Sequence, residues 1–92
     1  MNHFTEPSNE AVTTMKSILE GSAHILYVVN NEEGWQFLSG ANAQTAEAQV
    51  VALERVINAD PSIGELGNLP EGWHAWRATP ASLWSRAPYD AG

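Results

Sequence analysis

The chain has 92 residues and a net charge of −7, from 11 acidic and 4 basic side chains, and it contains no cysteine. This length suits a single small domain. The missing cysteine excludes disulfides and thiolate metal sites, and the few basic residues argue against binding to nucleic acid or to an anionic membrane. There is no apolar run of membrane-spanning length and no secretory signal pattern, so we predict a cytoplasmic protein.

The first element has two alternatives. A helix that begins after the capping residue Ser8 and ends before Gly21 fits the apolar side chains at helical spacing. A short strand over residues 11–14, followed by a helix over 15–20, fits the β-branched side chains at positions 12–14. We expect residues 1–7 to be disordered, a single domain over residues 8–80, and a C-terminal tail over 81–92 packed on that domain.

Residues 24–30 and 35–39 predict an antiparallel hairpin. The first arm is a compact run of β-branched and aromatic side chains, and the turn over 30–34 supplies Asn and Gly for positive φ angles. Alternation along the second arm places Trp35 and Phe37 on one face. We expect both aromatic side chains to lie in the core.

The next stretch predicts one long helix over residues 43–59. Its apolar stripe is formed by Ala46, Val50, Leu53 and Ile57, with Val51 off the stripe. The dipeptide Asp60–Pro61 ends this helix, and a short helical turn capped by Asp60 follows over 61–66.

Residues 73–79 alternate in the manner of a strand, and the tail is expected to lie as a loop or short helix over one sheet face. Together these elements predict an α+β fold: a small antiparallel sheet with one long amphipathic helix packed across it.

A search for catalytic chemistry finds little. The three histidines are far apart and lack metal-ligand spacing, and no serine lies in a nucleophile elbow. Glu71 and His74 are the only pair placed for acid–base work, and a spacing of three is a weak signal. We therefore predict no catalytic residues, no metal, no cofactor and no enzymatic activity.

Protein binding is better supported by the composition. Trp76 and Trp84, with Arg77 beside them, match the residue types that dominate binding hot spots, and Arg77 could stack on a Trp ring. The turn residues Glu32 and Glu33 add negative charge. We take these five residues as candidate partner contacts, with the alternative that Arg77 only screens the sheet and pairs with a carboxylate.

Several segments resemble a known family of small bacterial domains. They are Gly34-Trp35-Gln36-Phe37-Leu38-Ser39-Gly40, residues 50–57, Asp60-Pro61-Ser62-Ile63 and Leu69-Pro70-Glu71-Gly72. In order and spacing they are similar to the immunity protein 33 family, over roughly residues 12–78. The chain departs from the family pattern at Ala41 and Asn42, where acidic residues are frequent.

The resemblance implies a cytoplasmic immunity protein that neutralises a cognate toxin by occlusion, without catalytic residues or cofactor. The matching aromatic, glycine and proline positions are framework residues, since they fill the core and fix turns. Two alternatives remain: a small-molecule-binding or regulatory module, and a structural or oligomerisation domain in which the hairpin edge pairs with a second copy to form a homodimer.

Overall fold

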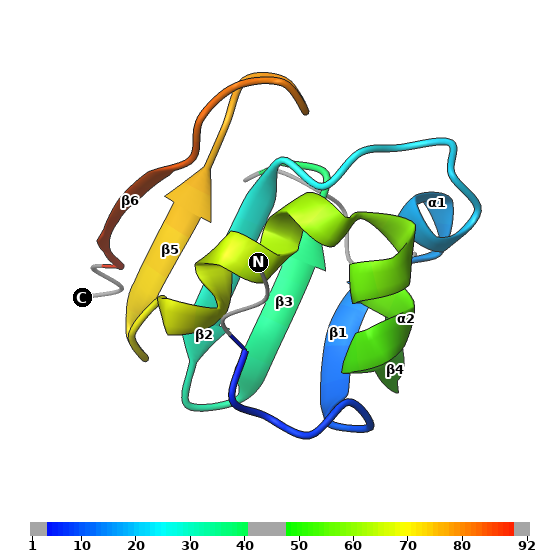
Figure 1. The fold of residues 1–92 in the computed structure, drawn as a ribbon, viewed down its shortest axis with the longest axis horizontal. Helices are drawn as coiled ribbons and strands as arrows, with labels where there is room; N and C mark the ends of the chain where they lie inside the picture. The colour runs from blue at the N-terminus through cyan, green and yellow to red at the C-terminus, as the bar shows by residue number, and fades with distance from the viewer. Residues whose placement is uncertain (1–3, 41–47, 90–92) are drawn as a thin grey trace.

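The computed structural model describes residues 4–40 and 48–89 and shows one sheet with its main helices packed on one face (Figure 1). Its elements are, in chain order, β1 (Ala11–Met15), α1 (Lys16–Leu19), β2 (Tyr27–Asn31), β3 (Gly34–Leu38), β4 (Ala48–Ala52), α2 (Leu53–Ala59), the 3₁₀ helix η2 (Pro61–Asn68), β5 (Trp73–Trp76) and β6 (Ser85–Pro88).

The sheet has six strands in the order β4-β1-β3-β2-β5-β6. Four neighbouring pairs are antiparallel, whereas β1 runs parallel to β3. The buried Thr14 hydroxyl donates to the Phe37 carbonyl at 2.9 Å and so adds a side-chain bond across that parallel pair. The sheet is therefore mixed and larger than the small antiparallel sheet expected from the sequence.

The prediction of one long helix over residues 43–59 is wrong, because the first part of its described residues forms a strand. Residues 48–52 form the edge strand β4, and only the seven residues of α2 are helical. Tertiary pairing explains the difference, because Val50 and Val51 lie opposite Thr13 and Val12 of β1 and β-branched side chains suit that position. Residues 41–47, including Ala46 of the expected stripe, lie outside the described residues.

At the N-terminal end, the structure agrees with the strand alternative. β1 covers residues 11–15, and α1 adds a single short turn of helix before Gly21. The β-branched side chains of Val12 and Thr14 are buried on the core side of the strand. Burial of this face decides against a continuous helix.

The hairpin prediction is confirmed. β2 and β3 pair antiparallel, with Tyr27 opposite Leu38 and Asn31 opposite Gly34. Gly34 has a φ of 109°, which only glycine adopts without strain. Trp35 and Phe37 are buried with their rings stacked at 5.9 Å, as the alternation predicted.

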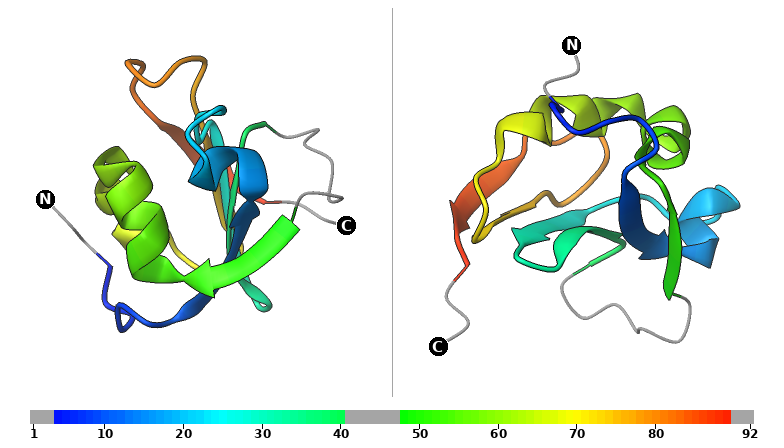
Figure 2. Two further views of the ribbon diagram at one scale, coloured as in Figure 1. Left: turned by 90° about the vertical axis from the view of Figure 1, so that its right-hand side faces the viewer. Right: turned by 90° about the horizontal axis from the view of Figure 1, so that it is seen from below.

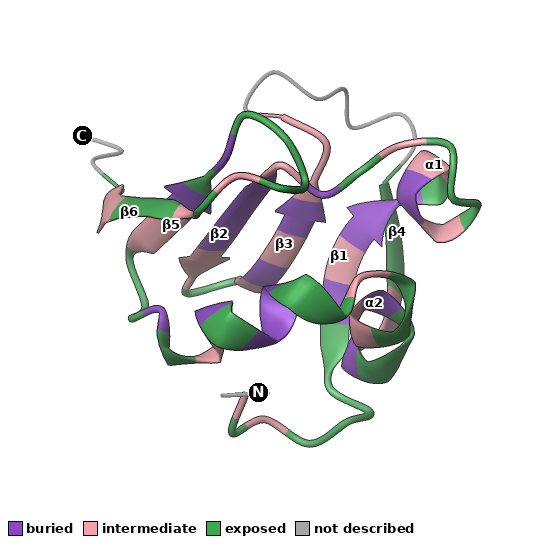
Figure 3. Ribbon diagram, turned by 45° about the horizontal axis from the view of Figure 1, so that its top comes forward, coloured by how far each residue is buried: buried purple, intermediate pink, exposed green. Residues whose placement is uncertain are grey.

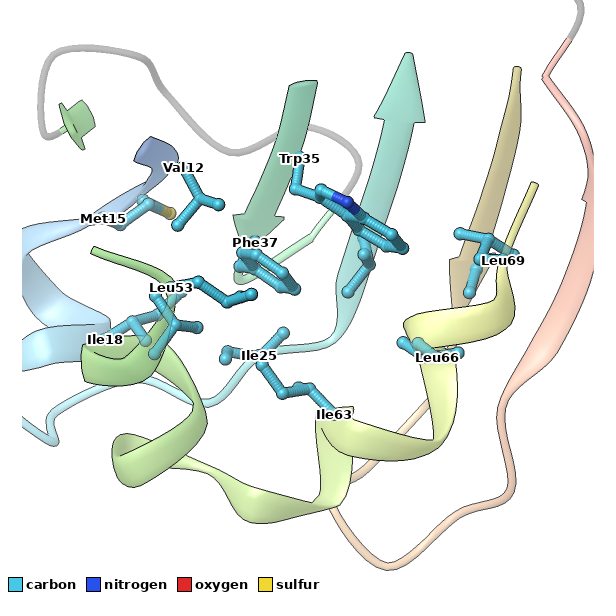
Figure 4. Packing of buried hydrophobic residues seen from close by; sticks show 13 residues of the cluster. Val12, Met15, Ile18, Ile25, Trp35, Phe37, Leu53, Ile63, Leu66 and Leu69 are labelled. Carbon is cyan, nitrogen blue, oxygen red and sulfur yellow. The ribbon is translucent and has the colours of Figure 1, made fainter. Parts of the chain in front are cut away.

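Helices α2 and η2 cover one face of the sheet in both views of Figure 2. Asp60 caps η2 by accepting from the Ser62 amide at 3.1 Å, as predicted, and η2 continues to Asn68. Figure 3 shows buried residues on the central strands and on the sheet side of these helices. Figure 4 shows their side chains pointing toward one another: Val12, Met15, Ile18, Ile25, Trp35, Phe37, Leu53, Ile63, Leu66 and Leu69.

Both ends of the described chain are more ordered than expected. Phe4 packs edge-on against Trp35 at 4.9 Å, and Glu6 accepts from the Trp35 indole N–H at 2.9 Å. The tail over residues 81–92 was expected as a loop or short helix, but its residues 85–88 form β6, which extends the sheet beside β5. Residues 1–3 and 90–92 lie outside the described residues.

Candidate functional site

The sheet face opposite α2 and η2 carries a row of aromatic side chains. His74 and Trp76 alternate with the buried Ala75 along β5, so they point away from the core. Register places Tyr27 of β2 opposite Trp76, and Tyr89 follows β6 with its amide bonded to the Gly72 carbonyl. We call these four residues, Tyr27, His74, Trp76 and Tyr89, the aromatic face.

His74 lies at the centre of the aromatic face. Its ring centroid is 5.5 Å from that of Tyr27, 5.0 Å from that of Trp76 and 5.2 Å from that of Tyr89. A hydrogen bond of 2.8 Å joins the Tyr27 hydroxyl to His74 Nδ1. These contacts hold the rings in a fixed arrangement while Trp76 remains 41% exposed.

The Tyr27 hydroxyl of this face has a raised pKa. Burial, and to a smaller extent the neighbouring Tyr89, raises the pKa of Tyr27 above its ordinary value near 10.0. Tyr27 therefore stays a neutral hydrogen-bonding group at physiological pH.

Two hollows lie at opposite ends of the aromatic face. The first, of about 350 Å³, is lined by Asn31, Glu32, Glu33, Glu71, Gly72 and Tyr89. The second, of about 380 Å³, is mostly apolar and is lined by Leu26, Tyr27, Ser39, Gly40, His74, Trp76 and Arg77. Tyr89 borders the acidic hollow and Trp76 the apolar one, so a single partner that covers the face contacts both.

Three predicted contact residues thus lie on one surface. Glu32 and Glu33 are exposed in the β2–β3 turn, where the Glu33 amide donates to the Asn31 side chain at 2.9 Å. Trp76 lies along the same face, at the far end of β5. Glu71, which the sequence suggested for acid–base work, lines the acidic hollow together with the two turn residues.

Arg77 does not belong to this surface as an exposed contact. Its guanidinium is buried and donates to the Ile25 carbonyl at 2.9 and 3.0 Å, to the Ser62 hydroxyl at 3.0 Å and to the Pro80 carbonyl at 3.1 Å. It also pairs with Asp60 at 2.8 Å. A side chain with this many internal partners stabilises the fold. The alternative that Arg77 pairs with a carboxylate is therefore confirmed, and the carboxylate is that of Asp60.

The Trp84 ring packs against the buried Arg77 guanidinium. The Arg77 guanidinium lies 4.2 Å from the centroid of the Trp84 ring, which confirms the predicted cation–π pair. Trp84 also packs against the hydrophobic core and is only partly exposed. Its main contacts are therefore internal.

In the part of the chain that the structure describes, the residues considered for acid–base or metal chemistry do not come together in one site. His74 is bonded to Tyr27, while Glu71 lines the acidic hollow. Over residues 4–40 and 48–89, no group of three His, Asp or Glu side chains could hold a metal ion. In the same ranges, no helix is long and apolar enough to cross a membrane.

Sequence reasoning missed the two tyrosines of the aromatic face. The sequence predicts Tyr27 in a buried strand and Tyr89 in the C-terminal tail over residues 81–92. The alternation of His74 and Trp76 against Ala75 was a usable signal for the face, but only the register of β2, β5 and β6 shows which rings join them.

Comparison with known proteins gives no match to a family model, to a curated protein or to a solved structure. The resemblance to immunity protein 33 therefore stays a prediction, and the function is argued from the geometry of this face.

Proposed function

We propose that this protein is a non-catalytic binding domain whose aromatic face and acidic hollow bind a basic surface of a partner protein. The observation that carries the proposal is the exposed Trp76–His74–Tyr89 row ending at the carboxylates of Glu32, Glu33 and Glu71. Aromatic anchors beside charged groups are the usual source of binding energy at protein interfaces.

Each end of the face favours a different partner group. A Lys or Arg side chain in the acidic hollow is attracted by the negative charge of Glu32, Glu33 and Glu71, which line it. An apolar side chain in the second hollow packs against Trp76 and Leu26. The net charge of −7 adds long-range attraction for a basic partner.

The resemblance described above supports a specific version of this proposal, in which the partner is a cognate toxin and binding blocks its active surface. A rigid face suits occlusion, because His74 already holds the three other rings and little ordering is needed on binding. The residues that contact the partner are Glu32, Glu33, Glu71, Trp76 and Tyr89.

The test pairs the protein with the product of the neighbouring gene, by calorimetry and by rescue of growth when that product is expressed. Trp76→Ala should weaken binding at least tenfold, and Glu32→Lys with Glu33→Lys should weaken it further and flatten its salt dependence. Leu83→Ala, at a site 90% exposed, and Glu54→Lys on α2 are matched controls that should bind as the wild type does.

Two results would contradict the proposal. One is the absence of binding and rescue with wild-type protein. The other is equal weakening by the Trp76 and Leu83 variants, which would place the interface elsewhere on the molecule.

A further inference from the structure

Among residues 4–40 and 48–89, the sheet has two edges without a partner strand, and neither belongs to the hairpin. β2 lies between β3 and β5, and β3 lies between β1 and β2, so the expected sheet extension through the hairpin edge cannot occur. The outer strands are β4 and β6. Any pairing with another chain through backbone bonds must use one of these two strands.

The outward backbone groups of β4 follow from its pairing with β1. The Leu53 amide donates to the Glu10 carbonyl at 2.8 Å, and residues whose backbone bonds face the partner strand alternate along an antiparallel pair. Gln49 and Val51 therefore bond to β1. The N–H and C=O groups of Val50, and the N–H of Ala52, point away from the sheet.

The two edges differ in how they are protected. β6 carries Pro88, which has no N–H, and the charged Arg86, and both features discourage pairing. β4 has the sequence Ala-Gln-Val-Val-Ala, without proline, glycine or charge, and Val50 is 71% exposed. In the left view of Figure 2, no described segment runs in front of β4.

We propose that β4 is a homodimer interface in which two copies pair antiparallel about a two-fold axis at Val50. In this register each Val50 exchanges both of its backbone bonds with the other Val50, and each Ala52 N–H meets the Ala48 carbonyl of the other copy. The strand is self-complementary in this arrangement.

The sequence of β4 favours a second copy as the occupant, because the residues with outward backbone groups, Ala48, Val50 and Ala52, are symmetric about Val50. In a protein of net charge −7, self-association requires a contact without like charges in opposition, and β4 is an uncharged five-residue strand. Burial of the two Val50 side chains against each other adds an apolar contact on the sheet surface. Because each copy contributes one strand, the interface is smaller than the ~1,600 Å² of a standard complex, and the dimer should dissociate on dilution.

Sedimentation velocity over a range of concentrations tests the proposal. The wild-type mass should rise from 10.0 kDa toward twice that value as concentration increases to about 1 mM. Val50→Lys should stay monomeric because two lysines oppose each other, and Val50→Pro should do so because the outward N–H is lost while the bonds to β1 remain. Ser85→Lys on β6 is the matched control and should dimerise as the wild type does.

A single introduced thiol gives a second readout, since the chain has no cysteine. Residues directly opposite in a bonded antiparallel pair have Cα atoms about 5.5 Å apart, within disulfide range. Val50→Cys should oxidise to a covalent dimer, whereas Ser85→Cys should remain largely monomeric.

A monomer at every concentration, or a dimer unchanged in Val50→Lys and uncross-linked in Val50→Cys, would overturn the proposal. Two strands separate β4 from β2 and three separate it from β5, so these outcomes are independent of partner binding at the aromatic face.

Discussion

The Arg77 guanidinium lies 2.8 Å from the Asp60 carboxylate, and their side chains are only 2% and 23% exposed. Asp60 is the capping residue of η2, and Arg77 follows directly after β5. The pair therefore ties the helical layer to the sheet. The Trp84 ring closes over the same guanidinium at 4.2 Å.

Replacing Arg77 by methionine should lower the free energy of unfolding by about 3 kcal/mol, because Asp60 and the Ile25 carbonyl lose their partner in a largely dry environment. Urea unfolding followed by circular dichroism measures the change. Lys16→Met is the matched control: its pair with Glu20 spans 4.0 Å between exposed side chains, and its loss should cost about 0.5 kcal/mol or less. Equal effects of the two substitutions would show that the buried cluster does not stabilise the fold.

Gly72→Ala should destabilise the protein by about 1 kcal/mol through the backbone alone. Gly72 has a φ of 87°, and a Cβ built there meets no atom within 4 Å, so the cost comes from the left-handed conformation. Gly40 has the same open surroundings without a positive φ, and Gly40→Ala should be neutral or slightly stabilising. Thermal unfolding of both variants separates the cost of the left-handed backbone at Gly72 from the cost of steric crowding by the added methyl group. Equal melting temperatures of the two variants would contradict a cost from the backbone conformation.

Stability should fall at alkaline pH because of Tyr27. Its pKa is raised in the folded state by burial and then by Tyr89, so the unfolded chain releases the proton more readily. Below pH ~10 the protonation of the two states is equal. Above it, ionisation of Tyr27 lowers the free energy of the unfolded state, and folding stability declines.

Comparison of wild-type protein with Tyr27→Phe isolates this effect. The free-energy difference between the two should be constant up to pH ~10, and above that pH the wild type should lose stability relative to the variant. Ultraviolet titration provides a second check, because the tyrosine absorbance that is lost in Tyr27→Phe should titrate above the ordinary pKa of 10.0. A difference that does not change with pH would show that Tyr27 ionises as freely in the fold as in the unfolded chain.

Trp76 should account for most of the tryptophan fluorescence that acrylamide quenches. It is the most exposed of the four tryptophans at 41%, whereas Trp35 is buried and Trp73 and Trp84 are packed against the core. Trp76→Phe should remove most of the quenchable emission and leave the blue-shifted remainder. Unchanged quenching in this variant would mean that Trp76 is covered in solution and unavailable to a partner.

The elements predicted correctly from the sequence are those set by local chemistry. Gly34 fixes the hairpin turn, and Asp60 with Pro61 fixes the start of η2. These signals act over a few residues, so the fold does not need to be known to interpret them. The alternation along β5 was also local, and it correctly separated Ala75 from His74 and Trp76.

The failures come from long-range pairing. Residues 48–52 have a composition that a helix accepts, and only β1, more than thirty positions earlier, turns them into a strand. Val51 was the residue that indicated an error in the predicted helix, because it did not lie on the apolar stripe. In the structure it packs against the core opposite Val12. The role of Arg77 was equally hidden, because its partners are scattered from Ile25 to Trp84.

The inner position of β1 determines the sequence of events during synthesis. Both flanking strands, β3 and β4, are translated after it, so β1 leaves the ribosome with neither neighbour available. This half of the sheet cannot close before residue 52 has emerged, and Val12 and Met15 stay open to water until then. A nascent chain that stops before residue 52 therefore exposes this apolar surface, and long-range pairing of this kind makes folding slow and prone to aggregation.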